Sequence, residues 1–367
     1  MKTPMHAARL GAALASALLL AACQSTMERP DDAMPALASV SEAFATRMTP
    51  DDNIDSVASW HAPDGRVWLL ATAKSTDKLV VYDGQTGATL REFGVRGEGN
   101  GQFRRPNGIV VADDLAFVIE RDNHRVQVLR LPGFEHVTSF GAGDLTKPYG
   151  GWVRRVGDAY HVYVTDSYDD GEDAAGNDIL PSLDRLDRRI RHYTLVLSGA
   201  KPEVALLGSY GDASPEGALR VVESIWGDPA HDRLLVAEED ETYANEIKVY
   251  DLAGRFTGRV FGRETFKAQS EGIALKACAD GSGWWVGTQQ GKDHSVFHLF
   301  DRKTLAHVAS FRGGKVSNTD GIWLDMAAST RFPQGALYAV HDDQGAVAFD
   351  WRDIARVLSL PACVVER

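Results

Sequence analysis

Lys78-Leu-Val-Val-Tyr82 is the first of six short, alternating hydrophobic segments that recur along this chain of 367 residues. The other five are Arg125-Val-Gln-Val-Leu129, Ile190-Arg-His-Tyr-Thr194, Glu246-Ile-Lys-Val-Tyr250, Ser295-Val-Phe-His-Leu299 and Gly345-Ala-Val-Ala-Phe349. Their first residues lie 47 to 65 positions apart, and two further short strands are expected before each segment. Repeats of this length built from short strands are typical of propeller blades. The sequence therefore predicts an all-β fold, a six-bladed β-propeller.

Length and composition fit a single domain. A propeller grows by adding blades, so residues 41–367 are expected to form one propeller rather than two domains. Hydrophobic residues make up 44% of the chain, which is enough to build cores between blades. The net charge of −12 argues against nucleic acid as a partner, because no basic surface would replace phosphate counterions. We expect a monomer.

The N-terminus carries an export signal. Lys2 and Arg9 precede an apolar run at residues 10–22 that is too short to be a stable membrane span. The run ends in Leu20-Ala21-Ala22-Cys23, which resembles the lipobox of bacterial lipoproteins, with Cys23 as the lipidated residue. The alternative is an ordinary signal peptide with a chance cysteine.

The lipobox sets the expected processing and location. Residues 1–22 would be a signal peptide, and residues 23–40, rich in Ala, Pro and Asp, would be a tether. Gln24 after the cysteine favours the outer membrane of a two-membrane bacterium. The protein is thus predicted to be exported, with a lipid anchor as its only membrane contact.

Two cysteines, Cys278 and Cys363, remain in the mature chain. An exported compartment permits a disulfide between them, but spacing alone does not show that they meet. Two free, buried thiols are an equal alternative.

Polar residues occupy one equivalent position in the six repeats. The position before each first strand, followed in every case by Ser or Gly, holds Asp55, Asn107, Gly150, Glu223, Glu271 and Asp320. In a propeller the first strand lines the central channel, so these residues are expected around one mouth. Turn chemistry is the alternative explanation, since Asp, Asn and Gly favour tight turns. Glutamate does not, and its two occurrences favour a functional ring.

A second set of charged residues follows the second strands and is expected at the same mouth. Blades one and two offer the cations Lys74 and Arg121, with Lys78 just beyond, whereas blades four to six offer mainly carboxylates and amides. Gathered without a cation, these carboxylates would repel one another by on the order of several kcal/mol or take up protons. Hard oxygen donors of this kind suit Ca²⁺, and no His and Cys cluster suggests zinc. The alternative is that residues 238–241 form a solvated acidic loop.

Five motifs follow one another in the second half of the chain, between Glu223 and Leu358. They are Leu234-Leu-Val-Ala-Glu-Glu-Asp-Glu241, Ser270-Glu-Gly-Ile273, Asp280-Gly-Ser-Gly-Trp-Trp-Val-Gly-Thr-Gln-Gln-Gly291, Asn318-Thr-Asp-Gly-Ile322 and Phe349-Asp-Trp-Arg-Asp-Ile-Ala355. In order and spacing they resemble the β-propeller phytases, which are calcium-dependent enzymes that hydrolyse inositol hexakisphosphate. Asp55 to Trp60 and Lys74 to Tyr82 extend the resemblance to the first blade.

The resemblance implies a role for particular residues. It places the calcium ligands at Asp55, Glu223, Glu239, Glu271, Asp320 and Asp342, with Tyr149 beside the metals. It also implies that Lys74 and Arg121, with Lys78 and Tyr149 nearby, bind the phosphate groups of the substrate. Glu239, Glu271, Lys74 and Arg121 would then carry the catalysis.

Three departures from the family pattern stand out. Asn107 replaces an aspartate in the second blade, and Ser167 replaces the basic residue of the third blade. The second blade, residues 99–128, resembles an NHL repeat, in which His124 and Arg125 are scaffold residues. The metal half of a phytase site is thus well represented, whereas the substrate half is reduced.

We therefore expect a calcium-dependent phosphomonoesterase acting on inositol hexakisphosphate or another small anionic phosphate ester through a metal-activated water. One alternative is a non-catalytic propeller at the cell envelope that binds a protein or glycan. Another is a calcium-dependent hydrolase of a different ester.

Residues 38–47 have a strand-like composition and are expected to supply the outer strand of blade six, which would protect the sheet edge.

Overall fold

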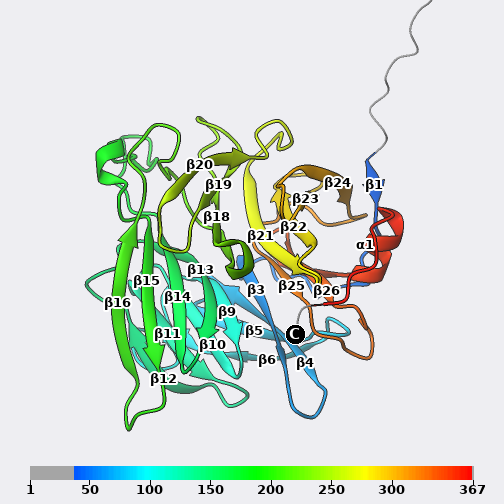
Figure 1. Cartoon of the computed structure of the whole chain (residues 1–367). Coiled ribbons are helices and arrows are strands. Elements are labelled where there is room, and N and C mark those ends of the chain that lie inside the picture. Colours follow the sequence, from blue (N-terminus) through cyan, green and yellow to red (C-terminus); the bar gives the residue numbers. More distant parts are fainter. Residues whose placement is uncertain (1–36, 366–367) are drawn as a thin grey trace, which may run out of the picture. The chain divides into compact units, whose positions relative to one another are not determined.

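The computed structural model describes residues 37–365, which form a six-bladed β-propeller, as predicted (Figure 1). The predicted signal peptide, the lipidation site Cys23 and most of the predicted tether lie outside the described residues. Every blade is built on an antiparallel sheet whose strands follow one another from the channel outward.

The first three blades follow the chain without interruption. Blade one contains β3 (Ile54–His61), β4 (Val67–Ala73), β5 (Lys78–Asp83) and β6 (Thr89–Phe93). The short parallel pair β7 (Val95–Arg96) and β8 (Gln102–Phe103) leads to blade two, with β9 (Pro106–Ala112), β10 (Leu115–Glu120), β11 (Arg125–Arg130) and β12 (Glu135–Phe140). Blade three contains β13 (Pro148–Val156), β14 (Ala159–Asp166), the 3₁₀-helix η1 (Leu183–Arg185), β15 (Ile190–Val196) and β16 (Glu203–Tyr210).

The last three blades repeat the pattern. Blade four contains β17 (Ile225–Asp228), the 3₁₀-helix η2 (Pro229–His231), β18 (Arg233–Glu238), β19 (Glu246–Tyr250) and β20 (Phe256–Phe261). Blade five contains β21 (Ser270–Ala277), β22 (Gly283–Gln289), β23 (Val296–Asp301) and β24 (His307–Arg312). Blade six contains β25 (Ile322–Asp325), β26 (Ala336–His341) and β27 (Gly345–Asp350), and helix α1 (Trp351–Val357) follows it. Within residues 37–365 no helix has the length and apolarity needed to cross a membrane.

The core lies between the blades. The six segments quoted from the sequence form the third strand of each blade, and their alternating side chains are buried on both faces. Six apolar clusters result, each shared by two neighbouring blades. The outer strand β6 is mostly exposed, as expected for the strand that faces solvent.

The N-terminal part of the described chain closes the ring. Strand β2 (Phe44–Ala45) pairs antiparallel with β27 as the outer strand of blade six, as expected. Strand β1 (Ala38–Ser39) also pairs, in parallel, with the outer edge of blade five at β24, and Val40 is buried. The propeller therefore begins at about residue 37 rather than at 41, because the free edge of β24 takes up residues predicted to belong to the tether.

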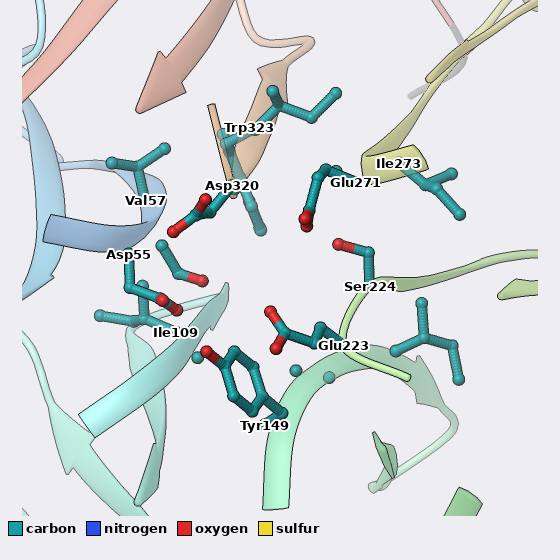
Figure 2. Close-up of a pocket in the computed structure, with 18 of the residues that line it drawn as sticks. Asp55, Val57, Ile109, Tyr149, Glu223, Ser224, Glu271, Ile273, Asp320 and Trp323 are labelled. Carbon is teal, nitrogen blue, oxygen red and sulfur yellow. The ribbon is translucent and has the colours of Figure 1, made fainter. Parts of the chain in front are cut away.

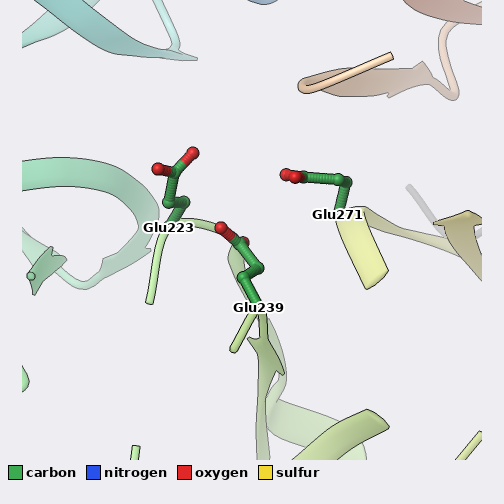
Figure 3. A group of neighbouring side chains, drawn as sticks. All are labelled: Glu223, Glu239 and Glu271. Atoms are coloured by element: carbon green, nitrogen blue, oxygen red, sulfur yellow. The ribbon is translucent and has the colours of Figure 1, made fainter. Parts of the chain in front are cut away.

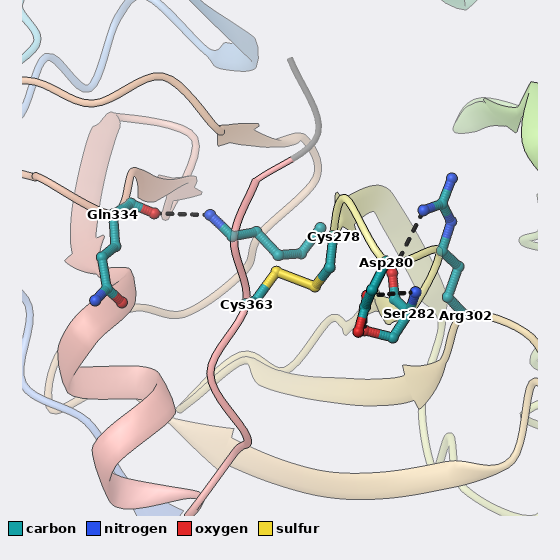
Figure 4. The surroundings of a disulfide bond; sticks show 7 residues. Cys278, Asp280, Ser282, Arg302, Gln334 and Cys363 are labelled. Carbon is teal, nitrogen blue, oxygen red and sulfur yellow. Dashed lines mark hydrogen bonds between the residues drawn. A yellow bond between two sulfur atoms is a disulfide. The ribbon is translucent and has the colours of Figure 1, made fainter.

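A disulfide joins Cys278 to Cys363 (Figure 4). Cys278 directly follows β21, and Cys363 lies in the segment after α1. Beside the bond, the Ala279 N–H donates to the carbonyl of Val364 over 2.7 Å. Of the two alternatives that the sequence left open, the structure has the disulfide, and it fixes the C-terminal segment to blade five.

Replacing both cysteines with alanine is expected to lower the free energy of unfolding by about 2–4 kcal/mol, because the bond restricts the unfolded chain over a separation of 85 residues. Urea-induced unfolding followed by tryptophan fluorescence measures the change. A reductant should destabilise the wild type to the same extent and leave the Cys278→Ala/Cys363→Ala variant unaffected. Equal stability of the oxidised wild type and the variant would contradict the prediction.

Candidate functional site

One residue from each blade surrounds a mouth of the central channel. These are Asp55, Asn107, Tyr149, Glu223, Glu271 and Asp320, which we call the ring residues. All of them except Asn107 line one narrow pocket (Figure 2). The pairing of β13 shifts between Pro148 and Gly151, just as that of β3 shifts between Ile54 and Val57. Tyr149 is therefore the ring residue of blade three, instead of Gly150 as predicted.

Backbone contacts between neighbouring blades place the ring residues. The N–H of Gly272 donates to the carbonyl of Asp320, and the N–H of Gly321 donates to that of Asp55, both over 3.0 Å. A Cβ atom on Gly150 would come within 2.1 Å of the Glu223 carbonyl oxygen, so this position has to be glycine. The small residue after each ring residue thus allows adjacent blades to approach each other closely at the channel.

Threonine hydroxyls make the same connection in two other blades. Thr72 donates to the carbonyl of Asn107 over 2.7 Å and accepts from the N–H of Ser56. Thr165 donates to the carbonyl of Glu223 over 2.8 Å and accepts from the N–H of Gly150. The side chains of the ring residues are left to point into the mouth, where irregular pairing at the start of a strand commonly directs functional groups.

Three glutamates meet on one side of the mouth. Carboxylate oxygens of Glu223, Glu239 and Glu271 all lie within 4.8 Å of one another (Figure 3). Glu223 precedes β17, Glu239 directly follows β18, and Glu271 belongs to β21, so blades four and five supply the group. We call these three residues the glutamate cluster.

On the other side of the mouth lie two aspartates, Asp55 and Asp320, whose negative charge is balanced by a lysine. The ammonium group of Lys74 forms an ion pair with Asp55 and lies 3.6 Å from a carboxylate oxygen of Asp320. The side-chain amide of Gln290 donates to Asp320 over 2.5 Å, and Asp343 shares a further hydrogen bond with Asp320. Lys74 therefore acts as an internal counterion for Asp55 and Asp320.

Burial and mutual repulsion raise the pKa of the glutamate cluster and of Asp320. The pKa of each residue in the glutamate cluster is well above its usual range, first because of burial and then because of neighbouring carboxylates. Burial, with Asp55 as the next cause, raises the pKa of Asp320 to about 8, although Lys74 opposes the rise. Burial opposes the charge on Lys74, yet Asp55 and Asp320 raise its pKa. Without a cation, burial and repulsion thus favour the protonated forms of these carboxyl groups, whereas a bound cation would favour the ionised forms.

Polar atoms without partners also mark the mouth. Oε2 of Glu239 is buried and accepts no hydrogen bond, and neither amide atom of the fully buried Asn107 has a partner. Buried polar groups nearly always have one. The ring residues that line the pocket offer carboxylate and phenol oxygens, which fit Ca²⁺ better than zinc. The residues present therefore fit a calcium site, with the glutamate cluster as its centre.

The pocket at this mouth is small. Its volume is about 60 Å³, which admits on the order of four to six water-sized occupants. Ions and waters fit into it, whereas an organic phosphate would have to lie outside, against the rim.

Three residues that were predicted to bind metal or phosphate contact side chains outside the ring instead. Lys78 pairs with Asp52 and Glu92, over 3.0 and 2.9 Å. The guanidinium of Arg121 pairs with its neighbour Asp122 over 2.7 Å. Asp342 accepts from the side chain of Gln344, and it is Asp343 that contacts the ring. His124 and Arg125 have scaffold contacts, as the NHL-like blade predicted, since Arg125 pairs with the buried Glu120 over 2.7 Å.

Arg105 is a candidate that the sequence did not reveal. Its charge acts on the phenol of Tyr149, and in the described part of the chain its buried Nε has no hydrogen-bond partner and its guanidinium no ion pair. With Lys74, Arg96 and Arg104 it lines a cavity of about 210 Å³ between blades one and two. Arg105 lies two residues before the ring residue Asn107, and this position is the feature of the sequence that points to it. The alignment of the six repeats starts at the ring position and therefore does not include Arg105.

The sequence matches no protein-family model and no curated protein sequence. The likeness to β-propeller phytases therefore rests on the motifs quoted above.

Several solved structures are similar in their arrangement. A Kuenenia stuttgartiensis hydrazine synthase is 15% identical and has a TM-score of 0.44, and the match covers 80% of this chain and 75% of that one. A chain of the mitotic checkpoint complex is 10% identical with a TM-score of 0.46, covering 93% and 82%. BBS1N in complex with ARL6DN is 11% identical with a TM-score of 0.45, covering 85% and 96%.

The raised carboxyl pKa values predict how the stability of the metal-free protein depends on pH. The folded protein holds protons that the unfolded chain releases, so its free energy of unfolding should fall as the pH rises from about 5 to 8. Urea unfolding in chelator at several pH values measures this slope. Millimolar Ca²⁺ should abolish the fall.

The control is the Glu239→Gln/Glu271→Gln variant, which lacks two of the repelling charges. The difference in slope between it and the wild type isolates the glutamate cluster from all other titrating groups. Identical slopes, or a wild type that Ca²⁺ does not stabilise, would contradict the assignment of the cluster as a metal site.

Proposed function

We propose that the ring residues bind calcium and that the protein is a calcium-dependent phosphomonoesterase. The observation that carries the proposal is the glutamate cluster: three carboxylates within 4.8 Å, with no positive side chain paired to them in the described part of the chain. Fully paired buried carboxylates elsewhere in the propeller show that this fold otherwise compensates such charges.

Glu223, Glu239 and Glu271 would hold the metal, with Asp55, Asp320 and Tyr149 completing the oxygen donors of the mouth. Bound calcium would supply a water of lowered pKa and positive charge against phosphate oxygens. Lys74 holds Asp55 and Asp320 in place by ion pairing, which keeps both carboxylates turned into the mouth.

The substrate would lie on the rim, because the pocket is too small for an organic phosphate. Arg105, whose charge acts on Tyr149 and whose guanidinium forms no ion pair among the described residues, is the cation best placed to bind a phosphate group there, although Asp77 and Asp122 line the same cavity. Arginine binds phosphate as a two-pronged donor, which fixes orientation as well as charge. Lys74 lines the same cavity, but its charge is already paired with Asp55 and Asp320.

Export as a lipoprotein belongs to the same proposal. The lipobox at Cys23 would anchor the protein, and the disulfide between Cys278 and Cys363 is consistent with an oxidising compartment. Calcium at millimolar concentration is available in such compartments, so a site of moderate affinity would be filled.

A second candidate is a metal-binding propeller without catalysis that recognises a protein or glycan at the envelope. It is favoured by the contacts of Lys78 and Arg121, which pair with local carboxylates and so remove two of the predicted phosphate-binding cations. The experiment below separates the two functions.

Phosphate release from inositol hexakisphosphate by the chain lacking residues 1–23 tests the proposal. Release is expected in millimolar Ca²⁺, and chelator or the Glu271→Gln substitution should reduce it to background. Glu241→Gln is the matched control, because Glu241 is exposed and two residues beyond the cluster. Calcium-dependent stability without release from this or a simple aryl phosphate would refute the phosphatase and favour the binding propeller.

Arg105 and Arg121 offer a direct comparison of two arginines. Arg105→Ala should raise the KM for the phosphate ester about tenfold or more, because a charge-assisted hydrogen bond to phosphate is lost. Arg121→Ala should change it by less than about twofold, since that guanidinium pairs with Asp122. Steady-state kinetics and thermal unfolding of both variants separate binding from folding. The reverse order of effects would show that the sequence-based assignment of Arg121 was right.

A further inference from the structure

Two tryptophans divide the central channel. Trp226 from β17 and Trp323 from β25 meet edge to face, with ring centroids 5.3 Å apart at 73°. Trp323 packs against apolar clusters on both flanks of blade one and between blades two and three, so it reaches across the channel from blade six. Its indole N–H donates to Ser59 over 2.8 Å, which fixes the ring in place.

The pair separates the acidic pocket from a second cavity. Both tryptophans line both spaces and are partly exposed. The second cavity has a volume of about 460 Å³, within the range of small-molecule sites. Its remaining lining comes from the far ends of the first strands and from the turns that follow them, including Val111, Leu324 and Met326.

Three aspartates line the second cavity, and two of them have a basic partner. Asp325 is compensated by His61 over 2.7 Å, and Asp113 by Arg155 over 3.2 Å. Asp114 is exposed, and among the described residues its carboxylate accepts from the indole N–H of Trp60 over 3.0 Å and forms no ion pair. No lysine or arginine is among the described residues that line this cavity. It therefore combines partly exposed indole rings with one exposed carboxylate that has no ion pair in the described part of the chain.

We propose that this second cavity binds a small organic cation, such as a quaternary ammonium compound. Tryptophan faces attract cations through the ring quadrupole, and Asp114 supplies the opposite charge. The apolar walls would contact the alkyl groups of such a ligand. A metal ion fits poorly, because calcium needs about six to eight oxygen ligands and the cavity offers few. An anion would be repelled by Asp114. The proposal is independent of the function proposed for the other mouth.

Calorimetric titration with choline tests the proposal on the chain lacking residues 1–23. The uncharged carbon isostere of choline, dimethylbutanol, is the matched ligand, and it should bind at least about tenfold more weakly if the positive charge is recognised. Asp114→Asn should weaken choline binding about fivefold to tenfold, while its side-chain oxygen still accepts from Trp60. Trp226→Leu should weaken it by about tenfold or more, with near-ultraviolet circular dichroism as the check on folding.

Glu239→Gln, at the other mouth, should leave choline binding unchanged, which ties the effect to the second cavity. Equal affinity for choline and dimethylbutanol would overturn the proposal and show an apolar cavity only. No binding of choline, or binding that Asp114→Asn and Trp226→Leu both leave intact, would overturn it as well.

Discussion

Closing six sheets around one axis brings the residues at the starts of the first strands together at a single mouth. The contacts that close the ring are made by the backbone: N–H groups of one blade donate to carbonyl oxygens of the next, as between Gly272 and Asp320. Because the backbone is used in this way, the side chains of the ring residues are directed into the mouth. Any acid at these positions is therefore buried near other acids, whatever its role.

Two neighbouring buried glutamates differ in whether other groups of the protein balance their charge. Glu238 is fully buried, but Lys248 lies 3.0 Å from it, and the N–H groups of Arg220 and Val221 donate to its carboxylate. Glu239, the next residue, has a buried oxygen without a partner and two other glutamates beside it. One charge is thus built into the scaffold, whereas the other requires a proton or a cation from solution. This contrast is the physical reason for assigning the glutamate cluster to metal binding.

Much of this could be predicted from the sequence, for identifiable reasons. The alternating apolar residues of strands such as Lys78–Asp83 revealed the blades. The alignment of the repeats found five of the six ring residues because a serine or a glycine follows each of them. The comparison misassigned blade three, since Gly150 and Gly151 both match the pattern and only strand pairing shows that Tyr149 holds the position. A repeat pattern also does not show which charged side chains form ion pairs with one another.

Arg121 illustrates that limit. In sequence it is a cation at the end of a second strand, equivalent to Lys74, but the adjacent Asp122 takes up its charge. Arg105 lies two residues before a ring residue and has no acidic residue next to it in sequence, but this position alone does not show that its guanidinium forms no ion pair in the described part of the chain. Burial and the absence of a partner make the difference, and both depend on the fold.

The tryptophan pair gives the two ends of the channel separate chemistry. Trp226 and Trp323 line both the acidic pocket and the second cavity, so their edge-to-face contact is a wall common to the two spaces. On one side of this wall the pocket has a volume of about 60 Å³, and burial and neighbouring carboxylates raise the pKa values of the glutamates that line it. On the other side lies a cavity of about 460 Å³ whose lining includes the two indole rings. The same aromatic contact therefore borders a space that favours a cation through oxygen donors and a space that offers indole faces.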